Sequence, residues 1–576
     1  MKMGRFRVWV PNAKKVELCI GDIEYSMMPV DNGYWQLQLQ NLQPHLLYAY
    51  KIDGRGPFPD PASPFLPEGV HGRSQRWVEE FAWNDKDWKA PGLENAVIYE
   101  LHVGTFSQEG TYAALQARLD HFINLGVTHI ELLPIAAFPG NHGWGYDGVG
   151  LYASHKAYGT PTQLKQLVDA CHARGLSIIL DVVYNHLGPD GNYLEQYAPY
   201  FSDRYHTPWG KAVNFDGSFS DQVREFFIEN ALGWLRDFHF DGLRLDAVHE
   251  IYDFSATHIL EEMQKRVDEL AAATGKSFVL IAESDLNDPK LIRSVRSGGY
   301  NLGAQWLDDF HHSVHVMLTG ESHGYYRDFS GAIDLKKCLR NAFVYDGKYS
   351  VARKRRHGRA VRNVDPWRFV VCTQNHDQVG NRAFGERLCH LVSFEFCQIA
   401  AALLFMSPYV PMIFQGEEWA ASSPFLYFTD HTDEKLARAV REGRRREYPA
   451  AHGSARRVPD PQSAQTFAKS ILKWEEIASG SHAEMHLWYR SLVALRLKYI
   501  KEIRSDRRCF EIIDDVRKLY VYSCGRLSLI VNAGEHVGEL LMPGQSPQVL
   551  LQNHRLKQSA GSVFLQPGTA AVIHCE

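Results

Sequence analysis

The feature that most constrains this chain is a regular alternation, between residues 96 and 503, of short apolar runs and amphipathic stretches. Runs such as "VIYELHVGTF" and "SIILDVVYNH" are apolar and rich in β-branched residues, which is typical of buried strands. Stretches such as "YAALQARLDHFINLG" and "PTQLKQLVDACHARG" repeat their apolar residues with helical spacing. Eight such strands alternating with helices predict an α/β fold, the (β/α)8 or TIM barrel.

One predicted helix is marked at both ends. Thr160 is a favourable N-cap, Pro161 suits the first helical position, and Gln163 completes a capping box. Gly175 stands just past the helix, where a glycine commonly ends one. These signals predict a helix that begins at Pro161 and ends before Gly175.

The pattern differs at the two ends of the chain. Residues 1–88 hold short alternating runs such as "RFRVWVP", with turn residues between them, and short strands return from about residue 504, as in "KLYVYSC". We therefore predict three domains: an N-terminal β-sandwich at 1–88, the barrel at 89–503 and a C-terminal β-sandwich at 504–576.

Charge and hydropathy disfavour two classes of partner. The formal net charge of -5 gives no support for nucleic acid, and the basic clusters "RKRRHGR" (353–359) and "RRR" (444–446) are predicted to be solvated faces, with nucleic-acid binding a minor alternative. The long apolar run "CQIAAALLFMSPYVPMIF" contains Pro408 and Pro411. These prolines favour a buried helix followed by a strand over a membrane span.

Cysteine usage indicates the compartment. The nine cysteines are scattered and form no C-x-x-C pair, which argues against a disulfide framework or a structural zinc site and favours a reducing environment. The first residues, "MKMGRFRVWV", lack the apolar core of a secretory signal. We expect a soluble, cytoplasmic protein with no membrane partner.

The stretch "DGLRLDAVHE" (241–250) places opposite charges in a predicted buried strand. Because side chains alternate along a strand, Arg244 and Asp246 share one face, opposite Leu243 and Leu245. A charge in a dry core is costly. The stretch therefore has two interpretations, a self-satisfied structural ion pair or a catalytic carboxylate that solvent reaches, and taken alone it favours the ion pair.

Polar residues close several other predicted strands. In a (β/α)8 barrel the active site lies at the carboxyl ends of the strands, so these residues would converge on one mouth. Each alone is better explained as a structural group, but several carboxyls together would repel one another and separate their pKa values, as acid and nucleophile roles require. The strand-closing residues are Asp181, Asn185, His186, Arg244, Asp246, His249, Glu283, Asn375, His376 and Asp377.

Three of these carboxyls fit the requirements of glycoside hydrolysis, which needs one carboxylate at the anomeric carbon and one protonated carboxyl for the leaving oxygen. Arg244 should hold Asp246 ionised, so Asp246 is the predicted nucleophile. Glu283 follows the apolar "FVLIA" among negative charge, conditions that raise a carboxyl pKa, and it is the predicted proton donor. Asp377 would bind ring hydroxyls and favour the positively charged transition state.

The segments "DVVYNH", "GLRLDAVH", "IAES" and "NHDQ" resemble, in order and spacing, the four signature segments of the α-amylase superfamily, glycoside hydrolase family 13. The resemblance implies a retaining mechanism through a β-glucosyl-enzyme intermediate, with Asp246 as nucleophile, Glu283 as acid and Asp377 as stabiliser. It also implies sugar contacts from Tyr146, His186, Arg244 and His376.

Longer segments narrow the expectation within the superfamily. "DPASPFLPEGVHGRSQ", "VVYNHLGPDGNYL", "TPWGKAVNFDG" and "QNHDQVGNRAFGERL" resemble the hydrolases that release trehalose from maltooligosyltrehalose. This implies cleavage of the α-1,4 bond beside the terminal trehalose, related α-glucans as ligands, a maltooligosyltrehalose synthase as pathway partner and a carbohydrate-binding module in 1–88. The alternative is an α-1,4-glucan branching enzyme or another glucan hydrolase of the superfamily.

Further substrate contacts are predicted at the strand ends and in the loops. The sixth strand is followed by "LDDFHH", in which Leu307 stands where the family pattern has Asn, so a contact at that position is in doubt. For the polar residues after it, buried structural roles are an equal alternative, and Trp144 and Trp209 either stack on glucose or pack in loops. The additional substrate-binding residues predicted are His249, Gln378, Asn381, Asp308, Asp309, His311, His312 and Trp209.

No cofactor and no metal ion are predicted. The histidines form no compact set such as H-E-x-x-H, and no dense Asp/Asn loop suggests calcium. A non-catalytic sugar-binding barrel is disfavoured because all three carboxylates are present.

Overall fold

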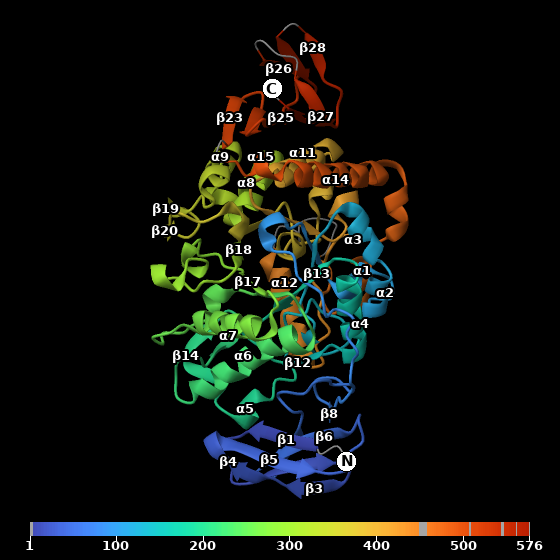
Figure 1. The fold of residues 1–576 in the computed structure, drawn as a ribbon, viewed down its shortest axis with the longest axis vertical. Coiled ribbons are helices and arrows are strands. Elements are labelled where there is room, and N and C mark those ends of the chain that lie inside the picture. The colour runs from blue at the N-terminus through green and yellow to red at the C-terminus, as the bar shows by residue number, and fades with distance from the viewer. Residues whose placement is uncertain (1–3, 449–457, 506–507, 543–546, 560, 575–576) are drawn as a thin grey trace.

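Three parts follow one another along the longest axis of the molecule (Figure 1). The N-terminal strands lie at one end, a barrel wrapped by helices occupies the middle, and the C-terminal strands lie at the other end. The computed structural model describes residues 4–448, 458–505, 508–542, 547–559 and 561–574. Cys575 lies outside these ranges, and the eight cysteines within them are free thiols.

The middle part is a closed parallel barrel, which confirms the predicted fold class. Its strands are buried along their whole length except at Val279, because helices cover the outside and side chains fill the inside. Within the described residues the eight barrel strands are β9 (Ile98–Leu101), β10 (His129–Leu132), β13 (Ser177–Val182), β16 (Gly242–Leu245), β17 (Val279–Ala282), β18 (Ala304–Trp306), β21 (Phe369–Cys372) and β22 (Val410–Phe414).

The helix α4 (Pro161–His172) has the predicted boundaries. The Thr160 hydroxyl accepts from the backbone N–H of Gln163, and the Gln163 side chain accepts from the backbone N–H of Thr160. Gly175 has a φ of +77°, in the left-handed region. Other helices outside the barrel are α3 (Leu119–Leu125), α6 (Ser220–Asp237), α7 (Ile259–Thr274), α8 (Asp308–Thr319), α11 (Phe394–Met406) and α14 (Gly480–Lys498).

The long apolar run folds as α11 followed by β22, as predicted. The helix ends at Met406, two residues before Pro408, and Pro411 lies within the buried strand. Tryptophan and tyrosine side chains of α14 pack against α11, and the Trp488 indole donates to the Gln398 carbonyl. Among the described residues, no helix is both long enough and apolar enough to cross a membrane.

The N-terminal part consists of two antiparallel sheets that pack against the barrel. Trp9 meets Tyr200 edge to face at 5.3 Å between ring centroids, and the Tyr197 hydroxyl donates to the Pro59 carbonyl. One sheet orders β1 (Gly4–Trp9), β5 (Tyr34–Leu39) and β4 (Met28–Val30); the other orders β3 (Ile23–Ser26), β2 (Val16–Ile20), β6 (Leu47–Ile52) and β7 (Arg55–Phe58), with β8 (Ser74–Gln75) beside β6.

The C-terminal part also has two antiparallel sheets. Its inner strands β25 and β30 are almost wholly buried, so the part has its own apolar core. The larger sheet orders β23 (Arg508–Asp514), β24 (Leu519–Cys524), β25 (Leu527–Asn532), β30 (Thr569–His574) and β27 (Gln548–Gln552); the smaller orders β26 (Gly538–Leu541), β29 (Ser562–Leu565) and β28 (Lys557–Ser559).

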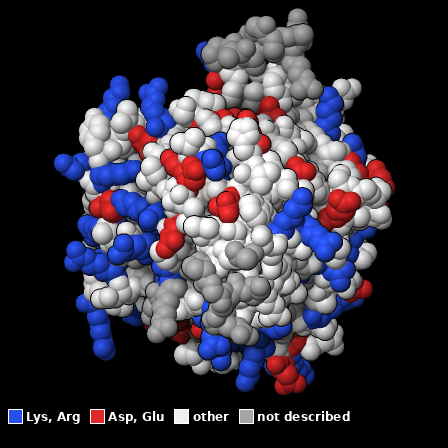
Figure 2. Space-filling model, turned by 90° about the horizontal axis from the view of Figure 1, so that it is seen from above, with Lys and Arg blue, Asp and Glu red and all other residues white. Residues whose placement is uncertain are grey.

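The two basic clusters differ from each other. Seen from the C-terminal end, Lys and Arg side chains gather at the left of the molecule (Figure 2), the side on which Figure 1 places β20 (Arg355–Gly358), where Arg355 and Arg356 are exposed. In the second cluster the expectation of a solvated face is wrong for Arg444. Its guanidinium is buried and donates to the carbonyls of Gly380 and Arg382, which supply acceptors for the buried charge.

Candidate active site

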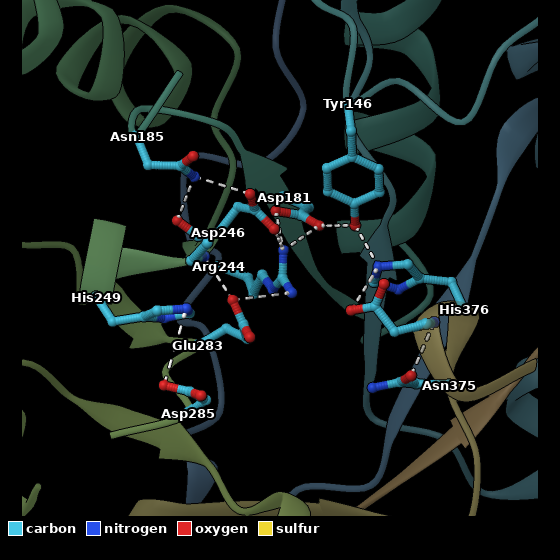
Figure 3. Close-up of polar contacts among 12 residues, drawn as sticks. Tyr146, Asp181, Asn185, Arg244, Asp246, His249, Glu283, Asp285, Asn375 and His376 are labelled. Carbon is cyan, nitrogen blue, oxygen red and sulfur yellow. Dashed lines mark hydrogen bonds and ion pairs between the residues drawn. The ribbon is translucent and has the colours of Figure 1, made fainter. Parts of the chain in front are cut away.

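Arg244 and Asp246 do form an ion pair, and the pair lies in a larger cluster at the carboxyl ends of the strands (Figure 3). Arg244, on β16, is fully buried and donates through Nη1 to Asp246 Oδ1 at 2.7 Å. The same nitrogen donates to both carboxylate oxygens of Asp181, on the neighbouring strand β13. Its guanidinium lies 4.2 Å from the ring centroid of Trp306. The ion-pair interpretation is therefore confirmed, and the paired carboxylate lies among the groups at the barrel mouth.

Asp246 is held ionised. The Asn185 amide donates to Asp246 Oδ2 at 2.8 Å and also to its backbone carbonyl, which fixes the carboxylate in place. Burial would raise the pKa of Asp246, but the positive charge of Arg244, the neighbouring His186 and these hydrogen bonds outweigh it and lower the pKa below the usual value. The carboxylate is therefore charged at neutral pH, as the predicted nucleophile must be.

Glu283 follows β17 and has the opposite electrostatics. Burial and the negative charges of Asp246 and Asp377 raise its pKa to about 7, although Arg244, with Nη2 3.8 Å from Oε2, lowers it. The backbone N–H of Ala247 donates to Glu283 Oε2. Ala247 adopts a φ of +39°, unusual for a residue with a side chain, and this turn directs its N–H toward the carboxyl. Glu283 is thus protonated in part of the population near neutral pH, as a general acid requires.

Asp377 is the most accessible of the three predicted catalytic carboxyls, with 42% of its side chain exposed. It lies in the first turn of α10 (His376–Gly380), where the Asn375 side chain caps the helix by accepting from the backbone N–H of Asp377. The Asn381 amide donates to Asp377 Oδ1 at 3.2 Å. The helix start therefore presents Asp377 to the mouth of the barrel.

The aromatic and histidine residues form one wall of the cluster. Tyr146 stacks on His376 with 5.0 Å between ring centroids, and its hydroxyl donates to Asp181 Oδ2 at 2.6 Å. His186 stacks on Trp209 at 4.4 Å, and Trp209 keeps half of its surface exposed. Trp144 is different: it is buried against Phe425 and its indole donates to a backbone carbonyl, so packing explains it.

The segment after β18 separates into two kinds of residue. Asp308 is partly exposed, and burial together with the charges of Glu283 and Asp377 raises its pKa to about 8, which puts its carboxyl among theirs. Asp309 is buried and accepts from the Asn287 amide and from two backbone N–H groups of the 344–345 segment. The structure thus favours the substrate-side interpretation for Asp308 and the structural one for Asp309.

Of the histidines of α8 that were predicted as sugar contacts, His311 is buried and His312 is partly exposed. His311 is buried between the Thr373 carbonyl, 2.6 Å from Nδ1, and the Tyr326 hydroxyl, 2.9 Å from Nε2. His312 packs against Tyr325 and Phe329 rings. These contacts favour the structural alternative for His311, because both of its ring nitrogens are already occupied. Leu307, where the family pattern differs, is buried and apolar.

The other predicted residues line the edge of the cluster. His249 Nε2 lies 3.9 Å from Asp285 Oδ1, and its charge contributes to the pKa of Glu283. Gln378 follows Asp377 in α10, and its Oε1 has no partner among the described residues. No group of three or more His, Cys, Asp or Glu in the described ranges is arranged to hold a metal ion.

One buried carboxyl of the cluster is not among the residues predicted from the sequence. Glu100, on β9, accepts from His376 Nδ1 at 2.6 Å and from the His376 backbone N–H at 3.1 Å. Its signal in the sequence is weak: it is the lone acidic residue of the apolar run "VIYELHV", 276 residues from its partner.

A closed (β/α)8 barrel whose mouth carries an ionised aspartate, a protonatable glutamate and a third carboxylate is a glycoside hydrolase of the α-amylase class. Two family profiles agree: residues 80–210 match "Alpha amylase, catalytic domain", and residues 2–65 match "Carbohydrate-binding module 48 (Isoamylase N-terminal domain)". A crystal structure of a Salmonella typhimurium protein superposes with a TM-score of 0.91 at 37% identity, covering 100% of this chain and 98% of that one.

Full-length relatives place the chain more narrowly. The malto-oligosyltrehalose trehalohydrolase of Arthrobacter ramosus is 46% identical over 575 residues, 99% of each chain. That of Saccharolobus solfataricus is 48% identical over 495 residues, 86% of this chain and 85% of the other. The chain belongs to the malto-oligosyltrehalose trehalohydrolase family.

Proposed function

We propose that this protein hydrolyses the α-1,4-glucosidic bond between a maltooligosyl chain and its terminal trehalose, releasing trehalose. The observation that carries the proposal is the opposed electrostatics of Asp246 and Glu283, which directly follow the adjacent strands β16 and β17: the pKa of Asp246 is below its usual value and that of Glu283 is about 7. Family membership supports the choice of substrate.

In the first step an Asp246 carboxylate oxygen attacks the anomeric carbon while Glu283 gives its proton to the glycosidic oxygen. The bond from the anomeric carbon to that oxygen breaks, trehalose leaves with the proton, and a β-glucosyl ester of Asp246 remains. In the second step the Glu283 carboxylate takes a proton from water, the water oxygen attacks the same carbon, and the ester bond breaks. Two inversions retain the α configuration.

The surrounding charges favour the transition state. Positive charge develops on the sugar ring, and Asp377 would stabilise it while binding ring hydroxyls. Arg244 keeps Asp246 ionised and, at 3.8 Å from Glu283, limits the rise of that pKa. Tyr146 and His186 would contact the same sugar, because both belong to the hydrogen-bonded wall described above.

Trehalose selectivity requires a shape on the leaving-group side of the bond. We assign it to the loops after the third and sixth strands, where Trp209 is half exposed and Asp308 carries a partly exposed carboxyl. Loops of this kind set specificity in a barrel. The pathway partner proposed is a maltooligosyltrehalose synthase, and the location proposed is the cytoplasm, in keeping with free thiols that form no C-x-x-C pair.

The test offers maltopentaose, amylose and maltotriosyltrehalose side by side, with products separated by chromatography. We expect strong preference for the trehalose-capped substrate and free trehalose as product, with none from the Asp246→Asn variant. New α-1,6 branches on amylose with little hydrolysis would instead identify a branching enzyme.

A further inference from the structure

His376 is a predicted sugar contact whose ring is held on both nitrogens by side chains of the described cluster. Its Nδ1 lies 2.6 Å from Glu100 Oε1, and its Nε2 lies 2.7 Å from the Tyr146 hydroxyl and 3.5 Å from Asp377 Oδ2. Both His376 and Glu100 are 1% exposed. The imidazole therefore joins a buried carboxylate on β9 to the groups at the mouth.

The hydrogen bonds fix where the protons lie. Tyr146 has one hydroxyl proton and donates it to Asp181. Both oxygens of Asp181 also accept hydrogen bonds from Arg244 Nη1. Toward His376 the Tyr146 oxygen can therefore only accept, so Nε2 carries a proton. Glu100 Oε2 accepts from the His376 backbone N–H, and Oε1 faces Nδ1. A carboxylate at Glu100 offers only acceptor oxygens, so Nδ1 carries a proton as well as Nε2. A ring protonated on both nitrogens is an imidazolium, which forms an ion pair with Glu100.

We propose that Glu100 is a positioning residue for the reaction: its carboxylate holds His376 doubly protonated, so that the Nε2–H is always available at the mouth beside Asp377. Glu100 does not itself reach the mouth, because His376 lies between Glu100 and Asp377. The inference rests on the proposed function, since it concerns how that site is kept in its working state.

The charges around His376 agree with this assignment. Burial and Arg244 oppose a positive ring, but Asp377 and Glu100 outweigh them and raise the pKa of His376 to about 9. Asp181 and Tyr146 face it from the mouth. His102, next along from β9, stays neutral because burial lowers its pKa to about 4.

Glu131 supplies a matched control. It occupies β10 directly opposite Glu100 in the strand register and is equally buried. Its two oxygens have no partner among the described residues, and burial with the charges of Glu100 and Asp181 raises its pKa well above the usual range. Glu131 is a neutral acid, so Glu131→Gln preserves shape and charge, whereas Glu100→Gln preserves shape and removes a charge.

The kinetic test compares pH profiles of kcat/KM for the wild type, Glu100→Gln and Glu131→Gln. For Glu100→Gln we expect a loss of about 10- to 100-fold at pH 7, the range found when a metal-binding histidine loses its orienting partner, and a steeper decline between pH 7 and 9, because deprotonation of His376 then adds to that of Glu283. For Glu131→Gln we expect the wild-type profile. Equal losses in both variants, or a wild-type profile in Glu100→Gln, would overturn the inference.

A second measurement needs no substrate. Nitrogen NMR of the full chain labelled at histidine, with the His376 signals assigned by their loss in His376→Gln, reports the ring protonation directly. We expect His376 of the wild type to remain doubly protonated above pH 8 and to titrate below pH 8 in Glu100→Gln. A neutral wild-type ring at pH 7 overturns the inference, while absence of trehalose release with a charged ring overturns the proposed function alone.

Discussion

Asp241 and Asp246 bracket the same barrel strand, β16, and their surroundings are opposite. Asp241, at the start, accepts from the Trp88 indole at 2.8 Å, the Ser177 hydroxyl, the Ile178 backbone N–H and His172 Nε2. Asp246, at the end, has two side-chain donors and shares its space with other carboxyls.

The difference separates architecture from chemistry. A carboxylate that four protein donors already hold has little left for a substrate, so Asp241 connects α4 and β13 at the floor of the barrel. A carboxylate with a free oxygen edge among like charges is reactive, and its neighbours acquire separated pKa values. The number of hydrogen-bond donors around each carboxylate, more than its burial, distinguishes Asp241 from Asp246.

The largest effect should follow from removing the charge at the reactive end. Asp246→Asn keeps the shape of the side chain, so we expect a fold close to native and a turnover reduced about 10⁴-fold or more. Steady-state kinetics on the trehalose-capped substrate, with circular dichroism as the folding control, measure both. Near-normal rates would mean that another group is the nucleophile.

Glu283→Gln should come next, at about 10²- to 10⁴-fold on natural substrates. The loss should be smaller with an activated aryl leaving group, which does not need the proton. Because the pKa of Glu283 is about 7 and the protonated form is the acid, wild-type activity should decline as pH rises through 7. Equal losses on both kinds of substrate would argue against the assignment.

At the start of the strand, we expect substitution of Asp241 to lower the stability of the protein and to leave the turnover rate unchanged. Asp241→Ala leaves His172 facing only Asp85 and removes four acceptor contacts, so we expect the free energy of unfolding to fall by about 3–5 kcal/mol. The denaturant midpoint reports this, with Asp203→Ala, at an exposed position, as control. Turnover per folded molecule should not change. A large change in turnover would mean that Asp241 also contributes to the reaction.

A smaller, pH-dependent effect is expected at Asp85. Burial opposes ionisation there, but hydrogen bonds from His239 and His172 prevail and lower its pKa. A depressed folded pKa stabilises the protein above the unfolded value, near 3.9, and that stability is lost as pH falls through the folded value. Wild type should therefore exceed Asp85→Asn in denaturant midpoint at pH 7 and approach it in acid, below the folded pKa of Asp85. A pH-independent difference would contradict this.

The smallest expected effect is that of a chelator. The described residues form no cluster suited to a metal ion, and we expect prolonged chelator treatment to leave activity largely intact. Activity that returns only with added calcium would contradict this and would require a ligand set at the mouth.

The sequence predicted those features that depend on local order. Apolar periodicity defined the barrel, proline positions divided the long apolar run into α11 and β22, and side-chain alternation put Arg244 and Asp246 on one face. These features depend on residues close together in the sequence, so they could be predicted without knowing the contacts between distant segments.

Features that depend on contacts between distant segments could not be predicted in the same way. Glu100 meets His376 only because β9 and the start of α10 converge at the barrel. Whether Asp309 faces the mouth or the core depends on the rotation of α8 and on the 344–345 backbone that reaches it. Arg444 is buried because loop carbonyls of residues 380–382 approach its helix.

The hydrogen bond from the Ala247 main chain to Glu283 has an evolutionary consequence. No change of side chain at position 247, short of proline, deletes that donor, because every other amino acid supplies the same N–H. What a substitution alters is the ease of holding the left-handed turn, φ +39°, that aims the donor. Part of the environment of Glu283 is thus determined by the backbone conformation. A comparison of residue identities between related genes would not reveal it.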